Sequence, residues 1–266
     1  MIHRSRVLLL TIKAKGDTMS IIYTPKGKAL EYSNLAANLY KGCSHGCTYC
    51  YAPKATFTDY EKFISQEYIR PRPKVLEQLE KDAEKFAGST EPILLSFTSD
   101  PYQPVEKTLK LTRHALLIFK RNGLKPQILT KAGKWAIERD VDLLSATDGI
   151  WAATLTSDSD QESLKWEPLA ALPHDRIDAL RFAKDSGLET WVSFEPVINP
   201  EAVLRLIDKT HSFVDLFKVG KLNHHPLEKE IDWAQFLHDV EKRLDKYGCK
   251  RYIKKDLEAY RSKIAA

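Results

Sequence analysis

The stretch Asn38–Pro53, NLYKGCSHGCTYCYAP, places three cysteines within eight positions at the spacing C-x3-C-x2-C. Three thiolates on one short loop can each hold one corner of a cubane iron–sulfur cluster, and here they are Cys43, Cys47 and Cys50. The fourth iron then has no nearby cysteine and keeps an open coordination position, as catalytic metals require. The stretch therefore predicts a cluster that is open to a ligand.

Other uses of these cysteines remain open on the residues alone. A zinc knuckle would add His45 or the distant Cys249, although structural zinc sites usually pair two C-x2-C units or C-x2-C with two histidines. The cysteines could also be unligated, or Cys249 could complete a cluster that serves only structure or electron transfer. A non-catalytic iron–sulfur or zinc-binding module is therefore the alternative to a catalytic cluster.

The composition is that of a folded chain. Of the 266 residues, 43% are apolar and 29% are charged, which is enough apolar surface for a core. The longest apolar run near the start, Val7–Ile12, is too short for a membrane helix or a signal-peptide core. Four cysteines, three of them crowded together, do not suit a disulfide framework. We therefore expect a cytoplasmic protein that makes no membrane contact.

The charge is uneven along the chain. Lys and Arg exceed Asp and Glu by 5 in total, but residues 1–28 carry six basic against one acidic side chain, and residues 241–266 carry nine against four. Basic ends on an acidic body are compatible with a polyanionic partner, although a solvated basic terminus is the commoner case. Nucleic acid is therefore a possible partner, and the substrate itself is not identified by the sequence.

Short β-branched stretches alternate with longer amphipathic ones, which predicts an α/β fold. The expected strands are Asn34–Tyr40, Ile93–Thr98, Lys125–Thr130, Gly149–Leu155, Glu189–Glu195 and Val214–Gly220. The expected helices are Lys74–Phe86, Lys107–Arg121, Trp135–Leu144, Asp175–Ser186, Pro200–Lys209 and Trp233–Tyr247. Six such units predict a parallel sheet that is open or curled into a barrel, with ligands at the carboxyl ends of the strands.

The cysteine spacing, with an aromatic residue before the last cysteine at the end of the first strand, resembles the radical S-adenosylmethionine (radical SAM) superfamily. The stretch Asn38–Pro53 is similar to the branch that includes spore photoproduct lyase and proteins labelled as DNA repair photolyases. The resemblance covers roughly residues 20–225 and implies a partial (β/α)6 barrel, in agreement with the six units.

The resemblance also implies a chemistry. In that family the three cysteines hold a 4Fe–4S cluster whose unique iron is chelated by S-adenosylmethionine. One electron, from a donor such as a flavodoxin or ferredoxin, cleaves the sulfonium to methionine and a 5′-deoxyadenosyl radical, which abstracts hydrogen from the substrate. We therefore expect an enzyme with these two cofactors and an unidentified, lyase-like reaction.

Polar residues after the second and third strands are candidates for binding the cofactor. Thr98, Ser99 and Asp100 offer hydroxyls and a carboxylate that suit an ammonium group, although Asp-Pro is also a common turn. The resemblance implies that this position supports the methionyl amine. Lys131 follows the third strand and suits a ligand carboxylate, or is solvated, and the resemblance implies contact with S-adenosylmethionine.

Further candidates are weaker. Tyr49 would pack beside the cluster, and the resemblance aligns Thr154 with a residue near the ribose. Glu167 and Arg176 match a pattern of that branch but could equally form a structural ion pair. Glu195 could bind the ribose or adenine side, or could simply cap the following helix.

One departure bears on the reaction. In spore photoproduct lyase a cysteine precedes Thr-Ser-Asp and returns hydrogen to the product radical, whereas this chain has Phe97 there. This disfavours DNA photoproduct repair, which we keep as a narrower alternative. The C-terminus has no C-x2-C-rich extension, so we expect no auxiliary cluster.

The chain is expected to divide into three parts. Organised sequence begins soon after Met19, so residues 1–18 are expected to be a flexible N-terminal extension and residues 19–225 the radical SAM core. Residues 226–266 are expected to form a helical, basic extension that packs on the barrel. Within it, Lys250–Lys255 is a candidate short strand that closes the open side of the barrel or steers an anionic substrate.

Overall fold

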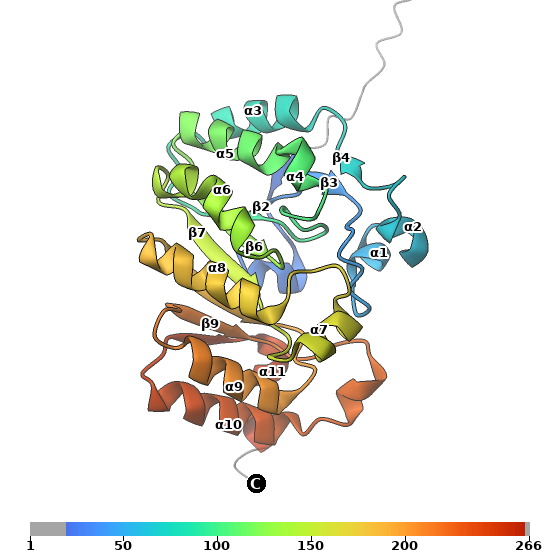
Figure 1. Cartoon of the computed structure of the whole chain (residues 1–266), viewed down its shortest axis with the longest axis vertical. Helices are drawn as coiled ribbons and strands as arrows, with labels where there is room; N and C mark the ends of the chain where they lie inside the picture. The colour runs from blue at the N-terminus through green and yellow to red at the C-terminus, as the bar shows by residue number, and fades with distance from the viewer. Residues whose placement is uncertain (1–19, 264–266) are drawn as a thin grey trace, which may run out of the picture.

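The computed structural model describes residues 20–263, and the expected extension at residues 1–18 lies outside them. In this part of the chain a mostly parallel sheet has the strand order β1-β2-β5-β6-β7-β8-β9-β10, and only β1 runs antiparallel to its neighbour (Figure 1). Its strands are β1 (Ile22–Tyr23), β2 (Leu35–Ala37), β5 (Ile93–Leu95), β6 (Pro126–Thr130), β7 (Ile150–Thr154), β8 (Glu189–Phe194), β9 (Leu216–Val219) and β10 (Arg251–Ile253). A separate two-stranded sheet pairs β3 (Tyr40–Lys41) with β4 (Arg70–Pro71).

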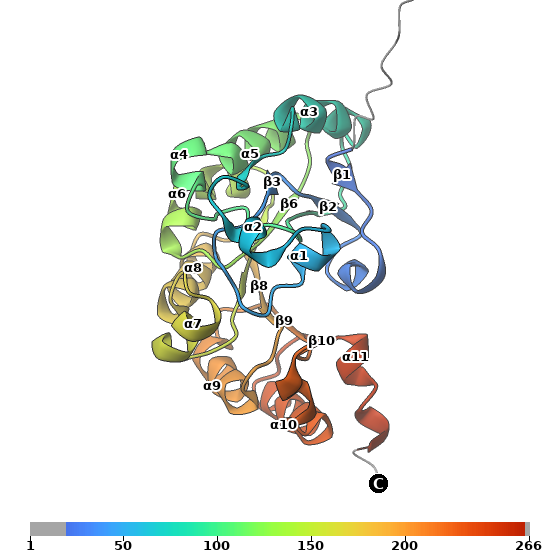
Figure 2. The same cartoon turned by 90° about the vertical axis from the view of Figure 1, so that its right-hand side faces the viewer.

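Helices cover the outer face of the main sheet. The long ones are α3 (Val75–Lys85), α5 (Leu111–Arg121), α6 (Lys134–Ser145), α8 (Pro173–Asp185), α9 (Pro200–Thr210) and α10 (Trp233–Lys246). Figures 1 and 2 show them stacked in chain order along one side. The shorter ones are α1 (Ala52–Ala55), α2 (Tyr60–Ile64), α4 (Glu106–Leu109), α7 (Asp160–Trp166) and α11 (Lys255–Glu258), with 3-10 turns at Gly27–Glu31, Pro226–Lys229 and Arg261–Lys263.

The strand order identifies a partial barrel. From β2 to β9 the sheet order equals the chain order, so each crossover advances in the same direction with its helix on the same face. β1 and β10 form the two edges and do not pair with one another. The predicted α/β fold and its six strand–helix units are confirmed.

Side chains alternate between the two faces of this sheet. On β8, Val192 and Phe194 belong to the main core beneath the helices, while Trp191 packs on the inner face. Ala36 and Ala152 lie in that same inner cluster. Their small side chains leave room inside the curved sheet. None of the helices described between residues 20 and 263 is long and apolar enough to span a membrane.

Several predicted boundaries differ from the structure, for example that of β5, which ends at Leu95, and two of the differences have a local cause. The first strand ends at Ala37 because the Asn38 side-chain oxygen accepts hydrogen bonds from the backbone N–H groups of Phe97 and Thr98, each at 2.9 Å. The helix expected over Lys107–Arg121 is split at Lys110, which has a φ of 51°. The Glu106 side chain accepts hydrogen bonds from the first backbone N–H groups of α5 and so begins a new helix.

Candidate active site

A cavity of about 450 Å³ lies at the carboxyl ends of the parallel strands, where the fold predicts a ligand site. The three cysteines of the motif and most of the polar candidates from the sequence line it: Tyr49, Thr98, Ser99, Asp100, Lys131, Thr154 and Glu195 with Cys43, Cys47 and Cys50. Glu167 and Arg176 are not among the residues that line it. The alternation of strands and helices therefore brings together residues that are more than 100 positions apart in the sequence.

The loop that carries the cysteines is held from two sides. The backbone N–H of Cys43 donates to the carbonyl of Phe63 at 3.3 Å, and a Cβ on Gly42 would lie 2.7 Å from that same carbonyl oxygen. With a φ of 71°, Gly42 is a position that only glycine fits. On the other side, Thr48 N–H donates to the carbonyl of Trp166 at 3.0 Å.

The electrostatics of the thiols fit a metal cluster. Burial raises the pKa of all three thiols, that of Cys47 to about 12. Such thiols stay neutral unless a cation compensates the thiolate charge, and iron supplies one. Among residues 20–263, no three His, Cys, Asp or Glu side chains converge on a point as one metal ion needs. A four-iron cluster binds each thiolate at a different iron, so it does not need that convergence.

The residues of the competing zinc hypothesis are also located. His45 lines the cavity, with Nδ1 3.5 Å from Oδ2 of Asp100, and burial lowers its pKa. Cys249 follows α10, packs against the main core and is not among the residues that line the cavity. The donor set therefore fits a three-cysteine cluster better than a single zinc ion completed by either residue.

Asp100 joins the ends of β5 and β6. Its Oδ1 accepts hydrogen bonds from Tyr102 N–H at 2.8 Å and from Thr130 Oγ1 at 2.6 Å, and its Oδ2 accepts one from Lys131 N–H at 2.7 Å. The adjacent Ser99 hydroxyl is buried and has no hydrogen-bond partner in the protein. A buried unpaired hydroxyl on a cavity wall suits a bound ligand.

Lys131 lies over the ring of Tyr49, with Nζ 5.8 Å from the ring centroid. Burial alone would lower the pKa of Lys131, but the electrostatic interaction with Cys47 in its thiolate form and with Glu167 raises it above its ordinary value. The side chain therefore remains an ammonium group within the cavity, which suits a ligand carboxylate.

Glu167 and Arg176 form an ion pair, one of the two alternatives that the sequence left open, 2.6 Å apart and with no exposed surface on either side chain. Burial raises the pKa of Glu167, but the Arg176 and Lys131 charges outweigh this and lower it overall. The sequence did not indicate that the Tyr49 hydroxyl also donates to Glu167, or that Arg176 Nη1 donates to the carbonyl of Thr154 at 3.0 Å. The pair thus connects the cysteine loop to the end of β7.

The opposite wall of the cavity contains residues that the sequence did not indicate. Tyr32 donates to Glu195, and the Lys254 ammonium lies 2.5 Å from Glu195 and 4.3 Å from the Tyr32 ring centroid. Glu195 does not cap the following helix, because Asn199 fills that role. The only available signal was the position of Lys254, within the candidate strand Lys250–Lys255 that became β10.

Sequence relatives match most or part of the chain. "Uncharacterized protein MJ0683" of Methanocaldococcus jannaschii is 30% identical over 98% of this chain and 96% of its own length. "Uncharacterized protein ORF301" of Acidianus two-tailed virus is 27% identical over 63% of this chain and 57% of its own length.

Solved structures share the fold. A spore photoproduct lyase variant matches with a TM-score of 0.64 and 13% identity over 89% of this chain and 79% of its own. A variant of that lyase with bound AdoMet and dinucleoside spore photoproduct has a TM-score of 0.62 and 14% identity, covering 88% and 78%. Streptococcus suis SuiB bound to S-adenosylmethionine has a TM-score of 0.57 and 13% identity, covering 86% and 52%.

The family model of the Radical SAM superfamily matches residues 37–214, which contain the cysteine loop and the strands from β5 to β8. With the motif, the fold and this match in agreement, the chain belongs to the radical SAM superfamily of enzymes, which use a 4Fe–4S cluster and S-adenosylmethionine.

Proposed function

We propose that this enzyme binds its cluster through Cys43, Cys47 and Cys50 and binds S-adenosylmethionine in the adjoining part of the cavity. When bound, the two cofactors supply reductive cleavage to a 5′-deoxyadenosyl radical, which abstracts a hydrogen atom from a substrate not yet identified. The observation that carries the proposal is that the three thiols and the polar strand ends line one cavity. An electron donor such as a flavodoxin or ferredoxin completes the reaction.

The chain's own residues then have distinct tasks on the cofactor side. The Lys131 ammonium would bind the carboxylate of S-adenosylmethionine, and the unpaired Ser99 hydroxyl, Thr98 and the Asp100 carboxylate would bind its amino group. Thr154, which also lines the cavity, would lie near the ribose. Tyr49, held by Glu167, packs beside the cluster and limits the access of water to it.

On the substrate side, the wall is built from both ends of the described chain. Lys28 lies 2.8 Å from Asp256 and donates to Asn223 at 3.1 Å, and Asn223 donates to Asp256 at 2.9 Å. Lys28 and Asn223 line the cavity, as do Lys26, Lys221 and Lys254. Three of these four lysines are paired with carboxylates, Lys28 with Asp256, Lys221 with Glu228 and Lys254 with Glu195, so the excess positive charge of the wall is small; together with the basic ends of the chain it favours an anionic substrate.

Nucleic acid is the anionic substrate class we propose, on the basic ends of the chain and this lysine-rich wall. One of the solved structures of similar fold is a spore photoproduct lyase complexed with dinucleoside spore photoproduct, and that likeness is one of fold alone. Phe97 lines the cavity where a thiol would be needed for that repair. We therefore propose a different reaction on a nucleic acid rather than photoproduct repair.

The test is reductive cleavage by the anaerobically reconstituted protein. With dithionite and S-adenosylmethionine we expect 5′-deoxyadenosine, measured by chromatography, and a brown protein that contains about four iron atoms per chain. Cys47→Ala should lose both, while Cys249→Ala, a matched change outside the cavity, should keep both. One zinc ion per chain with no iron uptake, or a Cys47→Ala protein with normal absorbance, would overturn the proposal in favour of a binding module.

A further inference from the structure

Gln103 is completely buried, and its side-chain amide bonds the backbone on both sides of Cys43. Its Nε2 donates to the carbonyl of Gly42 at 3.3 Å, and its Oε1 accepts from the backbone N–H of Ser44 at 3.0 Å. The Ser44 hydroxyl also donates to Oε1, at 3.5 Å, so the amide donates one hydrogen bond and accepts two. Glutamate of the same size lacks the donor, and leucine lacks both groups.

The segment that carries Gln103 also forms part of the proposed cofactor pocket. Asp100 lies three positions earlier, between β5 and α4, and contacts the end of β6 through Lys131 N–H. A few residues of backbone thus connect the wall where S-adenosylmethionine is proposed to bind with the loop that holds the cluster. A displacement of this segment would move Cys43 and Asp100 relative to one another.

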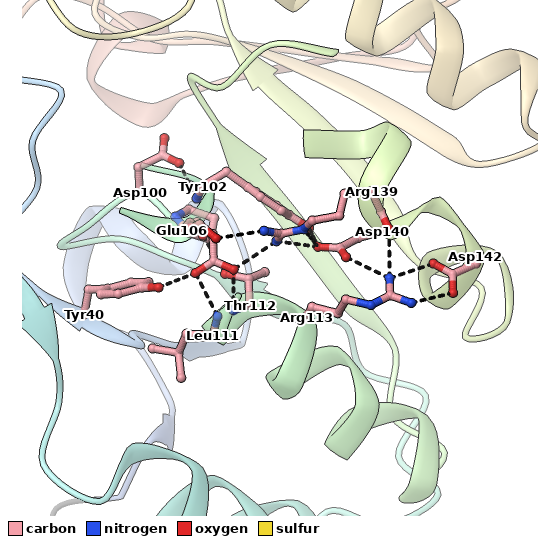
Figure 3. Close-up of polar contacts among 11 residues, drawn as sticks. Tyr40, Asp100, Tyr102, Glu106, Leu111, Thr112, Arg113, Arg139, Asp140 and Asp142 are labelled. Atoms are coloured by element: carbon pink, nitrogen blue, oxygen red, sulfur yellow. Dashed lines mark hydrogen bonds and ion pairs between the residues drawn. The ribbon is translucent and has the colours of Figure 1, made fainter. Parts of the chain in front are cut away.

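A buried polar network anchors that segment (Figure 3). Thr112 Oγ1 donates to the carbonyl of Pro101 at 2.5 Å, and the Tyr102 hydroxyl donates to Asp140 at 3.0 Å. Glu106, which has no exposed surface, accepts a hydrogen bond from the Tyr40 hydroxyl just before the cysteine loop.

Arg139 closes the network on its far side. It donates to the Glu106 carboxylate at 2.9 Å and lies 2.7 Å from Asp140. Figure 3 shows these side chains converging from β3, α4 and α6. Because both ends of the segment are fixed, Gln103 can hold Cys43 in one place.

We propose that Gln103 is a positioning residue that fixes Cys43, and through it one corner of the cluster, relative to the S-adenosylmethionine pocket. This rests on the proposed function. Gln103 also accepts the hydrogen bond of the Ser44 N–H, and Ser44 directly follows the proposed cluster ligand Cys43. Hydrogen bonds to the sulfurs raise the reduction potential of iron–sulfur clusters, so releasing this N–H beside Cys43 is expected to shift the potential upward.

The experiment compares Gln103→Leu and Gln103→Glu with Gln127→Leu. Gln127 is another buried glutamine, which donates only to the carbonyl of Tyr32 at 3.4 Å and does not line the cavity. Each protein is reconstituted anaerobically, and its iron content, the electron paramagnetic resonance spectrum of the reduced cluster and the midpoint potential are measured. Formation of 5′-deoxyadenosine is followed separately.

We expect Gln103→Leu to bind iron, to show a more positive midpoint potential and an altered spectrum, and to form 5′-deoxyadenosine about tenfold more slowly. Gln103→Glu keeps the acceptor for Ser44 N–H, so its potential should stay closer to the wild-type value. Gln127→Leu should match the wild type. Wild-type potential and spectrum in both Gln103 variants would overturn the proposal, whatever their activity.

A readout without the cluster covers the case in which a variant does not take up iron. In the apo protein, alkylation of Cys43 by iodoacetamide is measured by peptide mass spectrometry relative to Cys249. Loss of the two bonds should speed the alkylation of Cys43 in Gln103→Leu, and an unchanged ratio would contradict the positioning role. If instead the wild type binds a cluster but forms no 5′-deoxyadenosine, the proposed function fails while the comparison of potentials still decides the role of Gln103.

Discussion

The backbone N–H of Lys131 donates to Oδ2 of Asp100 at 2.7 Å, which joins the ends of two neighbouring parallel strands, β5 and β6. The sequence indicated these two residues separately, one for an ammonium and the other for a carboxylate. In the structure the Asp100 carboxylate also organises the backbone from which Lys131 projects. We therefore expect Asp100 to contribute to ligand binding both directly, through charge, and indirectly, through the position of Lys131.

Asp100→Ala is expected to keep the cluster but to weaken S-adenosylmethionine binding at least tenfold. Three donors lose their acceptor, and each buried donor left unpaired costs about 1–3 kcal/mol. Iron content and isothermal titration calorimetry on the reconstituted protein check this. Asp100→Asn keeps one acceptor oxygen, so its affinity for S-adenosylmethionine should lie between those of the wild type and Asp100→Ala. Asp185→Ala, on the exposed end of α8, should bind S-adenosylmethionine with wild-type affinity. Unchanged affinity in Asp100→Ala would reject the assignment.

Glu167→Gln should destabilise the apo protein by about 3–5 kcal/mol, because it leaves the charge of the fully buried Arg176 without its partner. The free energy of unfolding in urea measures this. Glu162→Gln, the same change at an exposed position on α7, should stay within about 0.5 kcal/mol of the wild type. If Glu167→Gln and Glu162→Gln changed the free energy of unfolding equally, the Glu167–Arg176 ion pair would not hold the loop next to Tyr49.

The sequence was sufficient to predict that the polar residues at the strand ends line one cavity, because parallel strands bring their carboxyl ends to one edge. Asp100, Lys131 and Thr154 each follow or end a strand whose apolar pattern is clear, so their common location follows from topology. For Glu167 and Arg176 the sequence left an ion pair as one of two alternatives, and the structure shows that pair. These predictions required no knowledge of side-chain contacts.

The remaining features depend on contacts that no local pattern encodes. Tyr32 and Lys254 meet only because β10 adds to the sheet beside β9, more than 200 positions after Tyr32. The break at Lys110 depends on the side chain of Glu106, and Gln103 bonds backbone groups that any residue carries. Sequence patterns report the burial and spacing of residues, whereas these interactions are set by tertiary geometry.

Asp158 should make the stability depend on pH in acid. Hydrogen bonds from Arg205 and Lys209 lower its pKa from 3.8 to about 2. A depressed folded pKa contributes stability that is full above the unfolded value and is lost as the pH falls through the folded one. The contribution should therefore disappear between about pH 4 and pH 2.

The size of this effect should be about 1 kcal/mol, because both cationic partners are half exposed to solvent. Urea unfolding of wild type and Asp158→Asn across this range measures it. The variant should be less stable near neutral pH and should converge with the wild type in acid. A constant difference between the two proteins down to pH 2 would show that the contribution is not electrostatic.

The lysine-rich wall should bind the proposed anionic substrate class. The double variant Lys254→Met, Lys28→Met removes two positive charges from the cavity. It also leaves Glu195 without its ammonium partner, so the wall should attract phosphates less strongly. Binding of a fluorescein-labelled single-stranded oligothymidylate, followed by fluorescence anisotropy, should weaken about tenfold, and its dependence on salt should become shallower.

Lys120→Met is the control for charge alone, because it removes one lysine from the exposed outer face of α5. It should leave oligothymidylate affinity within about twofold of the wild type, and neither set of changes should alter iron content. If Lys120→Met and the cavity variant weaken binding equally, the oligonucleotide binds through general surface charge and the wall is not its site. If the wild type does not bind the probe at all while it still forms 5′-deoxyadenosine, the substrate is not a nucleic acid and the radical chemistry stands independently.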